Sequence, residues 1–393
     1  MVTDTAPNPS ATFTRRFDLD WLRIIAFGTL IFYHIGMFFN TEHWHAKSVH
    51  ANAVIEPLMW MSSPWRLPLL FFISGVAIRF LSDKLGSSNF ALNRVWRLVP
   101  VIVFGIFVIV PPQTYSEVVS SGAFSGGFGE FYTQYAGILG GPWEVITPTY
   151  NHLWYVVYLL IYSVLLAAIL PILRWIADSK MMVRTGRAAN SGVIGTLGLI
   201  LIPTLPFLFY RFTLDPVFPV THALVDDWAN HARSLSFVLL GYLFAKNADL
   251  WRGVDRALPT ALILLAVTGG GLFLAYQNVE QVFSDPVMAL TARLARVIYA
   301  WLVILSLAGL AQRFLNHDGL IRRYFTEAIF PYYILHQTII VGVGFLIRDM
   351  GFGVWTEFGI LVAATIAGCA AGFEITKRVA LFRPIMGLKL RRG

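Results

Sequence analysis

Residues 21–39 have the sequence WLRIIAFGTLIFYHIGMFF, an apolar stretch that contains the ionisable side chains Arg23 and His34. Its length and composition predict a membrane-spanning helix. An ionisable side chain inside such a span is costly, so it is expected to face other helices and to mark a functional site. His34 follows Arg23 by eleven residues, close to three turns, and the two therefore share one helix face. We predict a cation near one membrane surface and a titratable base roughly 16 Å deeper, near mid-membrane.

The rest of the chain has the composition of a membrane protein. Of its 393 residues, 56% are hydrophobic, 15% aromatic and only 13% charged. Apolar runs of spanning length predict an all-α polytopic protein, a single bundle of about ten transmembrane helices. The predicted spans are 21–39, 65–81, 97–112, 152–173, 191–209, 232–247, 258–276, 292–313, 327–347 and 354–376. Several are interrupted by proline: Pro100, Pro203, Pro206 and Pro331.

Lys and Arg gather in the connections on one side of this bundle, whereas the segment 113–151 contains neither. Because cytoplasmic connections carry the excess of Lys and Arg, both termini are predicted to be cytoplasmic. This bias accounts for the net charge of +8 without nucleic-acid binding. We predict a disordered cytoplasmic tail, 1–16, and one transmembrane domain, 17–393. Its outer connections are 40–64, 113–151 and 210–231.

Two motifs near the cytoplasmic side suit a phosphorylated ligand with a narrow arm. Arg94 and Arg97 are three residues apart, so both guanidiniums leave one side of a helix, where their forked donors suit phosphate. The alternative is the ordinary excess of Arg at cytoplasmic helix ends. Ser74 and Gly75 either leave room for a ligand arm or let two helices pack closely.

Polar and aromatic side chains near the outer side suit a sugar. Each is also open to a structural interpretation, as an interfacial aromatic residue, a buried hydrogen-bonding histidine or a solvated acid. The histidines near residue 45 lack the spacing of a zinc site, so no metal is predicted. The candidate acceptor-binding residues are Trp44, His45, His152, Trp154, Asp226 and His336.

These motifs resemble membrane acyltransferase family 3 in their order and spacing, from about residue 17 to about residue 380. The segments that carry the resemblance are Arg23 with ten residues before His34, FFISG at 71–75, RVWR at 94–97, HLWY at 152–155 and YILH at 333–336. Within the family, HWHAK at 43–47 and FRP at 382–384 are similar to the succinyltransferase of osmoregulated periplasmic glucans.

The resemblance implies a bacterial inner-membrane O-acyltransferase. Its co-substrate would be acyl-CoA (succinyl-CoA or acetyl-CoA), and its acceptor a hydroxyl of a periplasmic glucan or other polysaccharide. Arg23 and His34 would be the catalytic pair, and Arg94 and Arg97 would contact the CoA phosphates. Ser74 and Gly75 would line the tunnel for the acyl arm.

Several alternatives stay open at this point. His34 acts either as general base or as a covalent acyl carrier. A secondary transporter or flippase for a sugar or lipid-linked substrate would use the same Arg23 and His34 for binding or proton relay. A succinyl group would require a further cation, for which position leaves four arginines. These are Arg66, Arg211, Arg293 and Arg296. Membrane lipid surrounds the protein in either case, and a homodimer is compatible with its small-residue helix faces.

Overall fold

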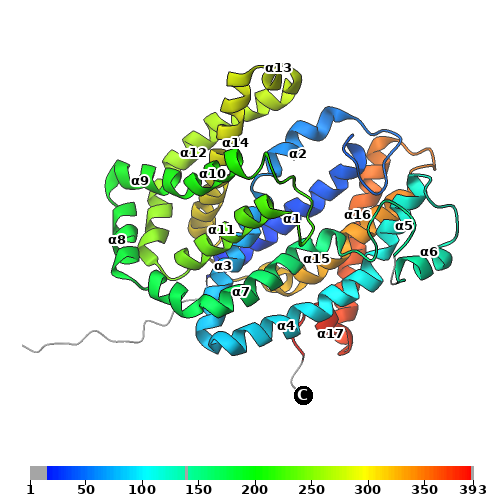
Figure 1. Cartoon of the computed structure of the whole chain (residues 1–393), viewed down its shortest axis with the longest axis horizontal. Helices are drawn as coiled ribbons and strands as arrows, with labels where there is room; N and C mark the ends of the chain where they lie inside the picture. The colour runs from blue at the N-terminus through cyan, green and yellow to red at the C-terminus, as the bar shows by residue number, and fades with distance from the viewer. Residues whose placement is uncertain (1–15, 138–139, 391–393) are drawn as a thin grey trace, which may run out of the picture.

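The computed structural model describes residues 16–137 and 140–390, and every regular element in these ranges is helical (Figure 1). The predicted disordered tail, 1–16, lies outside the described residues except for Arg16. The α-helices are α1 (Phe17–Phe39), α2 (Glu56–Ser62), α3 (Arg66–Leu85), α4 (Ser87–Phe104), α5 (Pro111–Ser120), α6 (Phe128–Tyr135), α7 (Trp154–Ala177), α8 (Lys180–Ala189), α9 (Gly192–Leu201), α10 (Leu205–Thr213), α11 (Trp228–Phe244), α12 (Ala248–Gln277), α13 (Val279–Ser284), α14 (Pro286–Phe314), α15 (Leu320–Ile347), α16 (Val354–Arg378) and α17 (Phe382–Ile385). Four short helical elements lie between them, η1 (Ala53–Ile55), η2 (Gly105–Ile109), η3 (Asn151–Leu153) and η4 (Ile202–Thr204).

Nine helical segments of the described chain are long and apolar enough to cross a membrane. They coincide with nine of the ten predicted spans, so the prediction of an all-helical membrane bundle is confirmed. The remaining predicted span, 232–247, coincides with α11, which has only 17 residues. The count of ten spans is therefore not confirmed.

Helix α1 lies inside the bundle, against α3, α14 and α15 (Figure 1). We call the end that carries the connections 40–52 and 214–227, with α5 and α6, the loop side, and the end that carries α8 and α17 the tail side. Helix α1 begins on the tail side, where Asp20 accepts a hydrogen bond of 2.5 Å from Arg322 at the start of α15. Helix α16 ends there too, since Arg383 of α17 donates to the carbonyl oxygen of Lys377 at 3.0 Å. Both ends of the described chain lie on one side; that this side is cytoplasmic stays a prediction.

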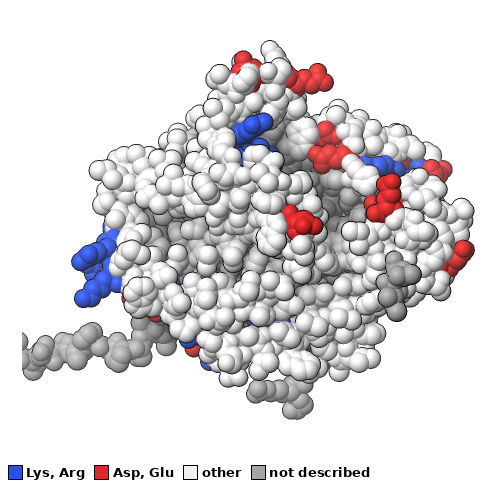
Figure 2. Space-filling view, in the orientation of Figure 1, with Lys and Arg blue, Asp and Glu red and all other residues white. Residues whose placement is uncertain are grey.

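The surface charge follows this division. On the face shown in Figure 2, most of the surface is uncharged, as expected where lipid contacts a protein. The basic patch at the left of the view lies over α8, whose exposed cations are Lys180, Arg184 and Arg187.

The predicted outer connections contain more helix than the sequence indicated. The segment 40–64 includes α2, and the segment 113–151, predicted as a loop, includes α5 and α6. Helix α6 forms because Phe131 and Tyr135 recur on one helix face and pack with Val118 of α5. By contrast, Pro203 and Pro206 do interrupt a span, since η4 separates α9 from α10.

Helices α3 and α11 cross with their backbones in direct contact. A Cβ atom at Gly75 would lie 1.9 Å from the carbonyl oxygen of Val238, and one at Gly241 would lie 1.9 Å from that of Phe72. Small residues permit such close approach between membrane helices. Gly75 is therefore a packing residue, one of the two interpretations that the sequence left open.

Replacing Gly75 by alanine is expected to destabilise the protein by about 3 kcal/mol, because the added methyl group meets backbone rather than a movable side chain. The effect is measured as a lower Tm of the purified protein in detergent. Gly28→Ala of α1 is the matched control, since a Cβ atom there meets nothing within 4 Å. A Gly75→Ala protein that keeps the wild-type Tm would contradict the packing role.

Candidate active site

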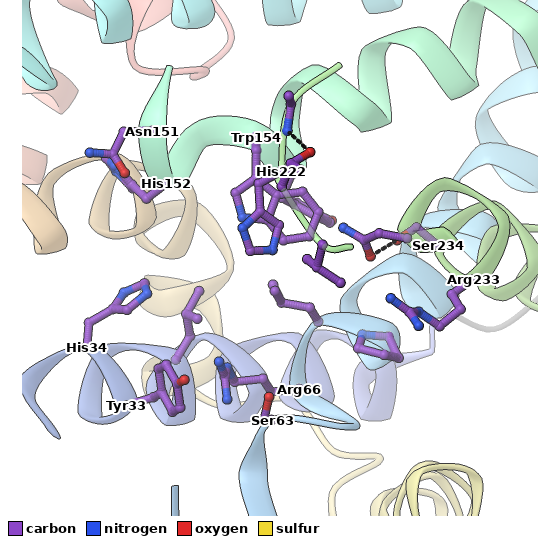
Figure 3. A pocket seen from close by; sticks show the side chains of 18 of the residues that line it. Tyr33, His34, Ser63, Arg66, Asn151, His152, Trp154, His222, Arg233 and Ser234 are labelled. Carbon is purple, nitrogen blue, oxygen red and sulfur yellow. Dashed lines mark hydrogen bonds between the residues drawn. The ribbon is translucent and has the colours of Figure 1, made fainter. Parts of the chain in front are cut away.

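A cavity of about 1010 Å³ opens on the loop side of the bundle. Its walls come from α1, α3, α7 and α11 and from the connections between helices (Figure 3). The predicted site residues that line it are His34, Trp44, His45, His152 and Trp154. The predicted residues outside its lining are Arg23, Ser74, Gly75, Arg94, Arg97, Asp226 and His336. The cavity is at the upper end of the volume range of small-molecule sites.

His34 lies nearer the loop side than predicted. Helix α1 ends at Phe39, five residues after His34, which places the imidazole about 8 Å from that end of the helix rather than at mid-membrane. Arg23 and His34 do share one face, because both contact the same neighbour, α15. Arg23 donates to the carbonyl oxygen of Thr326 at 2.9 Å, and Nδ1 of His34 lies 2.8 Å from Nε2 of His336.

The hydrogen bonds of His336 define the tautomer of His34. Nδ1 of His336 lies 2.7 Å from the carbonyl oxygen of Tyr333, which can only accept, so this nitrogen carries the proton. In the neutral ring, Nε2 of His336 is then an acceptor, and Nδ1 of His34 must donate to it. Nε2 of His34 is therefore unprotonated, and no described residue hydrogen-bonds to it. Figure 3 shows the His34 ring pointing from α1 into the cavity.

His45 has both ring nitrogens engaged. Nδ1 donates to Glu117 at 2.6 Å. Nε2 accepts from the side-chain amides of Asn151 and Gln337, each at 3.1 Å. His45 therefore joins α5, η3 and α15 at the cavity mouth and has no free lone pair for proton transfer.

His152 is engaged in the same way. Nε2 donates to the carbonyl oxygen of Ile334 at 3.1 Å, and Nδ1 accepts from the Gln113 amide at 3.3 Å. Of the four clustered histidines, only His34 retains a ring nitrogen without a partner in the described part of the chain. Within this hydrogen-bonded cluster, His34 is thus the histidine that is able to accept a proton; His43 and His222 line the cavity outside the cluster.

The connection 40–52 folds back over His34 because Lys47 anchors it to the end of α1. The Lys47 amine donates to the carbonyl oxygens of Met37 at 2.6 Å and Asn40 at 2.9 Å, where a helix favours a cation. Burial lowers the pKa of Lys47 to about 8. The indole of Trp44 lies nearly parallel to the His34 ring, with 6.3 Å between the ring centroids.

The connection 214–227 closes the opposite wall. Trp154 stacks on His222, with 4.3 Å between ring centroids, so one face of the indole is already covered. Asp226 is exposed and has a φ of 82°. Its neighbour Asp227 is buried and accepts a hydrogen bond of 2.6 Å from Tyr158, so it shapes the connection. Neither carboxylate lines the cavity, and the predicted acceptor contact of Asp226 has no support from its position.

Aromatic rings form the floor of the cavity. Phe71 and Tyr155 lie 4.8 Å apart between ring centroids, and Phe27 lies 5.2 Å from Tyr333 and 6.4 Å from Tyr155. The Tyr155 hydroxyl forms a hydrogen bond of 2.7 Å with Ser74. Ser74 therefore contacts this floor from beneath, outside the cavity lining.

Three arginines gather beyond this floor. Arg94 donates to Ser163 at 3.1 Å, lies within electrostatic range of Arg97, and interacts with Tyr155. Arg97 also lies within range of Arg23. Mutual repulsion of these cations favours a bound polyanion. The structure thus brings three predicted residues from α1 and α4 together on the far side of the rings from His34.

The profile of the acyltransferase domain, family 3, matches residues 16–374. The chain belongs to acyltransferase family 3. No curated protein and no solved structure matches the chain. Membership identifies the protein as a membrane acyltransferase and confirms the family predicted from the motifs. It favours an acyltransferase over the transporter alternative.

Several cavity residues of this family 3 protein were not selected from the sequence. Tyr33, Asn151 and Gln337 lacked a distinguishing pattern, although Tyr33 adjoins His34 and Asn151 adjoins His152. The arginines proposed for a succinyl group indicated the cavity better than these residues did. Arg66, Arg211 and Arg296 line the cavity, whereas Arg293 does not. Arg233 and His222 also line it. Arg233 lies on α11 and His222 in the connection 214–227, so their positions at the cavity depend on contacts between segments far apart in the sequence.

Proposed function

We propose that this protein transfers an acyl group from acyl-CoA, bound on the tail side, to a carbohydrate hydroxyl in the loop-side cavity. The bacterial inner membrane, with the loop side facing the periplasm, is part of the proposal. The observation that carries it is the unprotonated Nε2 of His34, the one ring nitrogen among His34, His45, His152 and His336 without a partner in the described part of the chain. Acyl transfer to a hydroxyl requires such a base.

In the proposed reaction, Nε2 of His34 takes the proton of the acceptor hydroxyl while its oxygen attacks the thioester carbonyl. The C–S bond then breaks, and the protonated His34 returns the proton to the departing CoA sulfur. The products are an O-acylated carbohydrate and free CoA. Proximity to His336 supports the imidazolium that forms in the step, because the carbonyl oxygen of Tyr333 fixes the relay of hydrogen bonds behind it.

The arginine cluster supports the binding of CoA on the tail side. CoA carries its phosphates at one end and its thioester at the end of a long flexible arm. Forked guanidinium donors suit the phosphates. In this proposal the arm reaches His34 between Phe27, Phe71, Tyr155 and Tyr333, which separate the cluster from the cavity. Ser74 lies beside this route through its bond to Tyr155.

The acceptor is expected to bind in the mouth of the cavity. Trp44 presents an indole beside His34, and aromatic faces suit sugar rings. The resemblance to succinyltransferases of periplasmic glucans supports a glucan hydroxyl as acceptor. His45 and His152 belong to the hydrogen-bonded wall of this mouth rather than to the reacting groups.

The proposal is tested with purified protein in detergent, by acyl-CoA-dependent release of free CoA in the presence of a glucan. Mass spectrometry of the glucan identifies the acyl group and the acceptor. A transporter would release no CoA above the rate seen without protein. That result, obtained with a folded protein and with both acetyl-CoA and succinyl-CoA, would contradict the proposal.

Replacing Arg94 by glutamine is expected to raise the KM for acyl-CoA about tenfold or more with little change in kcat, since a lost charge-assisted hydrogen bond is worth about 1.5–3 kcal/mol. The same change at Arg97 should act alike, and both effects should shrink at high salt. Arg184→Gln of α8 removes a tail-side cation far from the cluster and serves as control. Equal KM values for acyl-CoA in all variants would contradict the proposed contact with the CoA phosphates.

A further inference from the structure

Four arginines line the loop-side cavity, against two carboxylates. Asp215 forms ion pairs with two of the arginines, with Arg211 at 3.0 Å and with Arg233 at a shorter distance. The second carboxylate, Glu117, pairs with His45. The wall therefore carries an excess of positive charge, and the excess is not spread evenly.

Arg66 is one of the two cavity arginines that form no ion pair with a described residue, and it is the buried one. Its side chain is only 6% exposed, yet no carboxylate of the described residues lies within ion-pair distance. Nη1 donates to Ser62 at 3.2 Å, and Nε is buried without a hydrogen-bond partner. Burial of an unpaired cation is strongly unfavourable. An unpaired, buried cation in the wall of a cavity therefore indicates an anionic ligand.

The position of Arg66 is fixed rather than adaptable. Its guanidinium lies 3.3 Å from the centroid of the Tyr33 ring, a cation–π contact that orients the plane. Tyr33 adjoins His34 on α1, and Figure 3 shows Arg66, Tyr33 and His34 along one wall. Arg66 and His34 are also close enough to interact electrostatically.

Arg296 of α14 completes the arrangement. It donates to the Tyr276 hydroxyl at 2.5 Å, forms no ion pair with a described residue, and lies within electrostatic range of Arg66. Two guanidiniums without carboxylates repel each other, and an anion between them would relieve both. A chloride ion would satisfy the charge alone, whereas a forked guanidinium prefers a carboxylate or phosphate in a defined plane.

We infer that Arg66, assisted by Arg296, forms a subsite for an anionic oxygen group of the substrate, a carboxylate or a phosphate, beside the reacting base. This inference rests on the proposed acyl transfer and names the substrate class of the same site. The anion has two sources: the far end of a dicarboxylic acyl group, or an acidic substituent of the carbohydrate acceptor. A neutral acyl group on a neutral sugar would leave the subsite empty.

The test compares wild type with Arg66→Gln in detergent, using donors of equal chain length, succinyl-CoA and butyryl-CoA, on a neutral glucan. A second pair of acceptors, a neutral glucan oligosaccharide and its glucuronate-containing analogue, is used with butyryl-CoA. In Arg66→Gln, kcat/KM should fall about 10- to 100-fold for the anionic member of one pair and much less for its neutral partner.

Selective loss of kcat/KM for the succinyl donor assigns the anion to the acyl group. Selective loss for the glucuronate acceptor assigns it to the carbohydrate. Equal loss for charged and neutral substrates overturns the subsite.

A binding measurement separates this inference from the proposed function. Succinate should raise the Tm of wild type more than the neutral diol butane-1,4-diol does, and Arg66→Gln should remove the difference. If Arg66→Gln does not fold, Arg296→Gln is measured in its place, and Arg66→Lys keeps the charge while losing the fork. Arg348→Gln removes a loop-side cation outside the cavity and should leave the succinate-specific rise in Tm as in wild type. No turnover by wild type with any donor refutes acyl transfer; the absence of a succinate-specific rise in Tm refutes the subsite.

Discussion

Replacing His34 by alanine is expected to lower kcat for acyl transfer by about 10²–10⁴-fold, the contribution typical of a general base. The reason is geometric: His45 and His152 have both ring nitrogens in hydrogen bonds, so neither can take over the proton. The measurement is CoA release from acyl-CoA at saturating glucan. The KM for acyl-CoA should stay within a few-fold of wild type, because the proposed phosphate contacts lie on the far side of the aromatic floor.

The control for His34→Ala is His50→Ala. His50 lies in the same loop-side connection but outside the cavity lining, with Nε2 bonded to the carbonyl oxygen of Phe352 at 2.8 Å. It should retain wild-type turnover. Near-normal turnover by folded His34→Ala would refute the general-base role.

The same protein distinguishes direct transfer from a covalent intermediate. Incubation with acyl-CoA in the absence of acceptor, followed by a rapid quench and intact-mass measurement, would show one added acyl group if His34 carries it. The added mass should be missing from His34→Ala. A wild-type protein that turns over without any added mass supports direct attack by the hydroxyl.

Much of the fold was accessible from the sequence because membrane helices follow one simple physical rule. Long apolar runs have no other stable form in lipid, so nine of the predicted spans coincide with helices long enough to cross a membrane. The shared face of Arg23 and His34 followed from helical periodicity alone and agrees with their two contacts to α15. The prediction that the segment 113–151 is a loop was wrong. Its Gly- and Ser-rich composition indicated a loop, but the spacing of the aromatic residues in 128–135 favours a helix.

The site was only partly accessible, because its chemistry depends on which groups meet across helices. His336 was predicted as an acceptor contact, yet it lies behind His34 and is fully buried. Arg66 stood among four arginines that position could not separate, and only burial and pairing distinguish it. Gly75 had two interpretations until the approach of α11 was known. Sequence spacing orders residues along one helix, whereas tautomers, ion pairs and backbone contacts belong to pairs of helices.

His336 is expected to be a positioning residue, and His336→Leu should lower kcat about 100-fold. Without an acceptor at Nε2 of His336, Nδ1 of His34 loses the partner that holds its proton, and the ring is free to place the proton on Nε2 instead. Loss of the partner that fixes a catalytic tautomer lowers kcat by up to about 10⁴-fold in hydrolytic triads. The KM for acyl-CoA should not change, because His336 contacts none of the clustered arginines and does not itself line the cavity.

Two further measurements separate this role from simple packing. His336→Gln presents an amide oxygen near the position of Nε2 and an amide N–H toward the carbonyl oxygen of Tyr333, so it should recover most of the lost kcat. The ¹⁵N NMR shifts of His34 should show a protonated Nδ1 and a bare Nε2 in wild type and His336→Gln, and a mixture in His336→Leu. If both variants lose activity equally while the His34 shifts stay as in wild type, His336 only fills space, and the bare Nε2 of His34 must owe its state to another group.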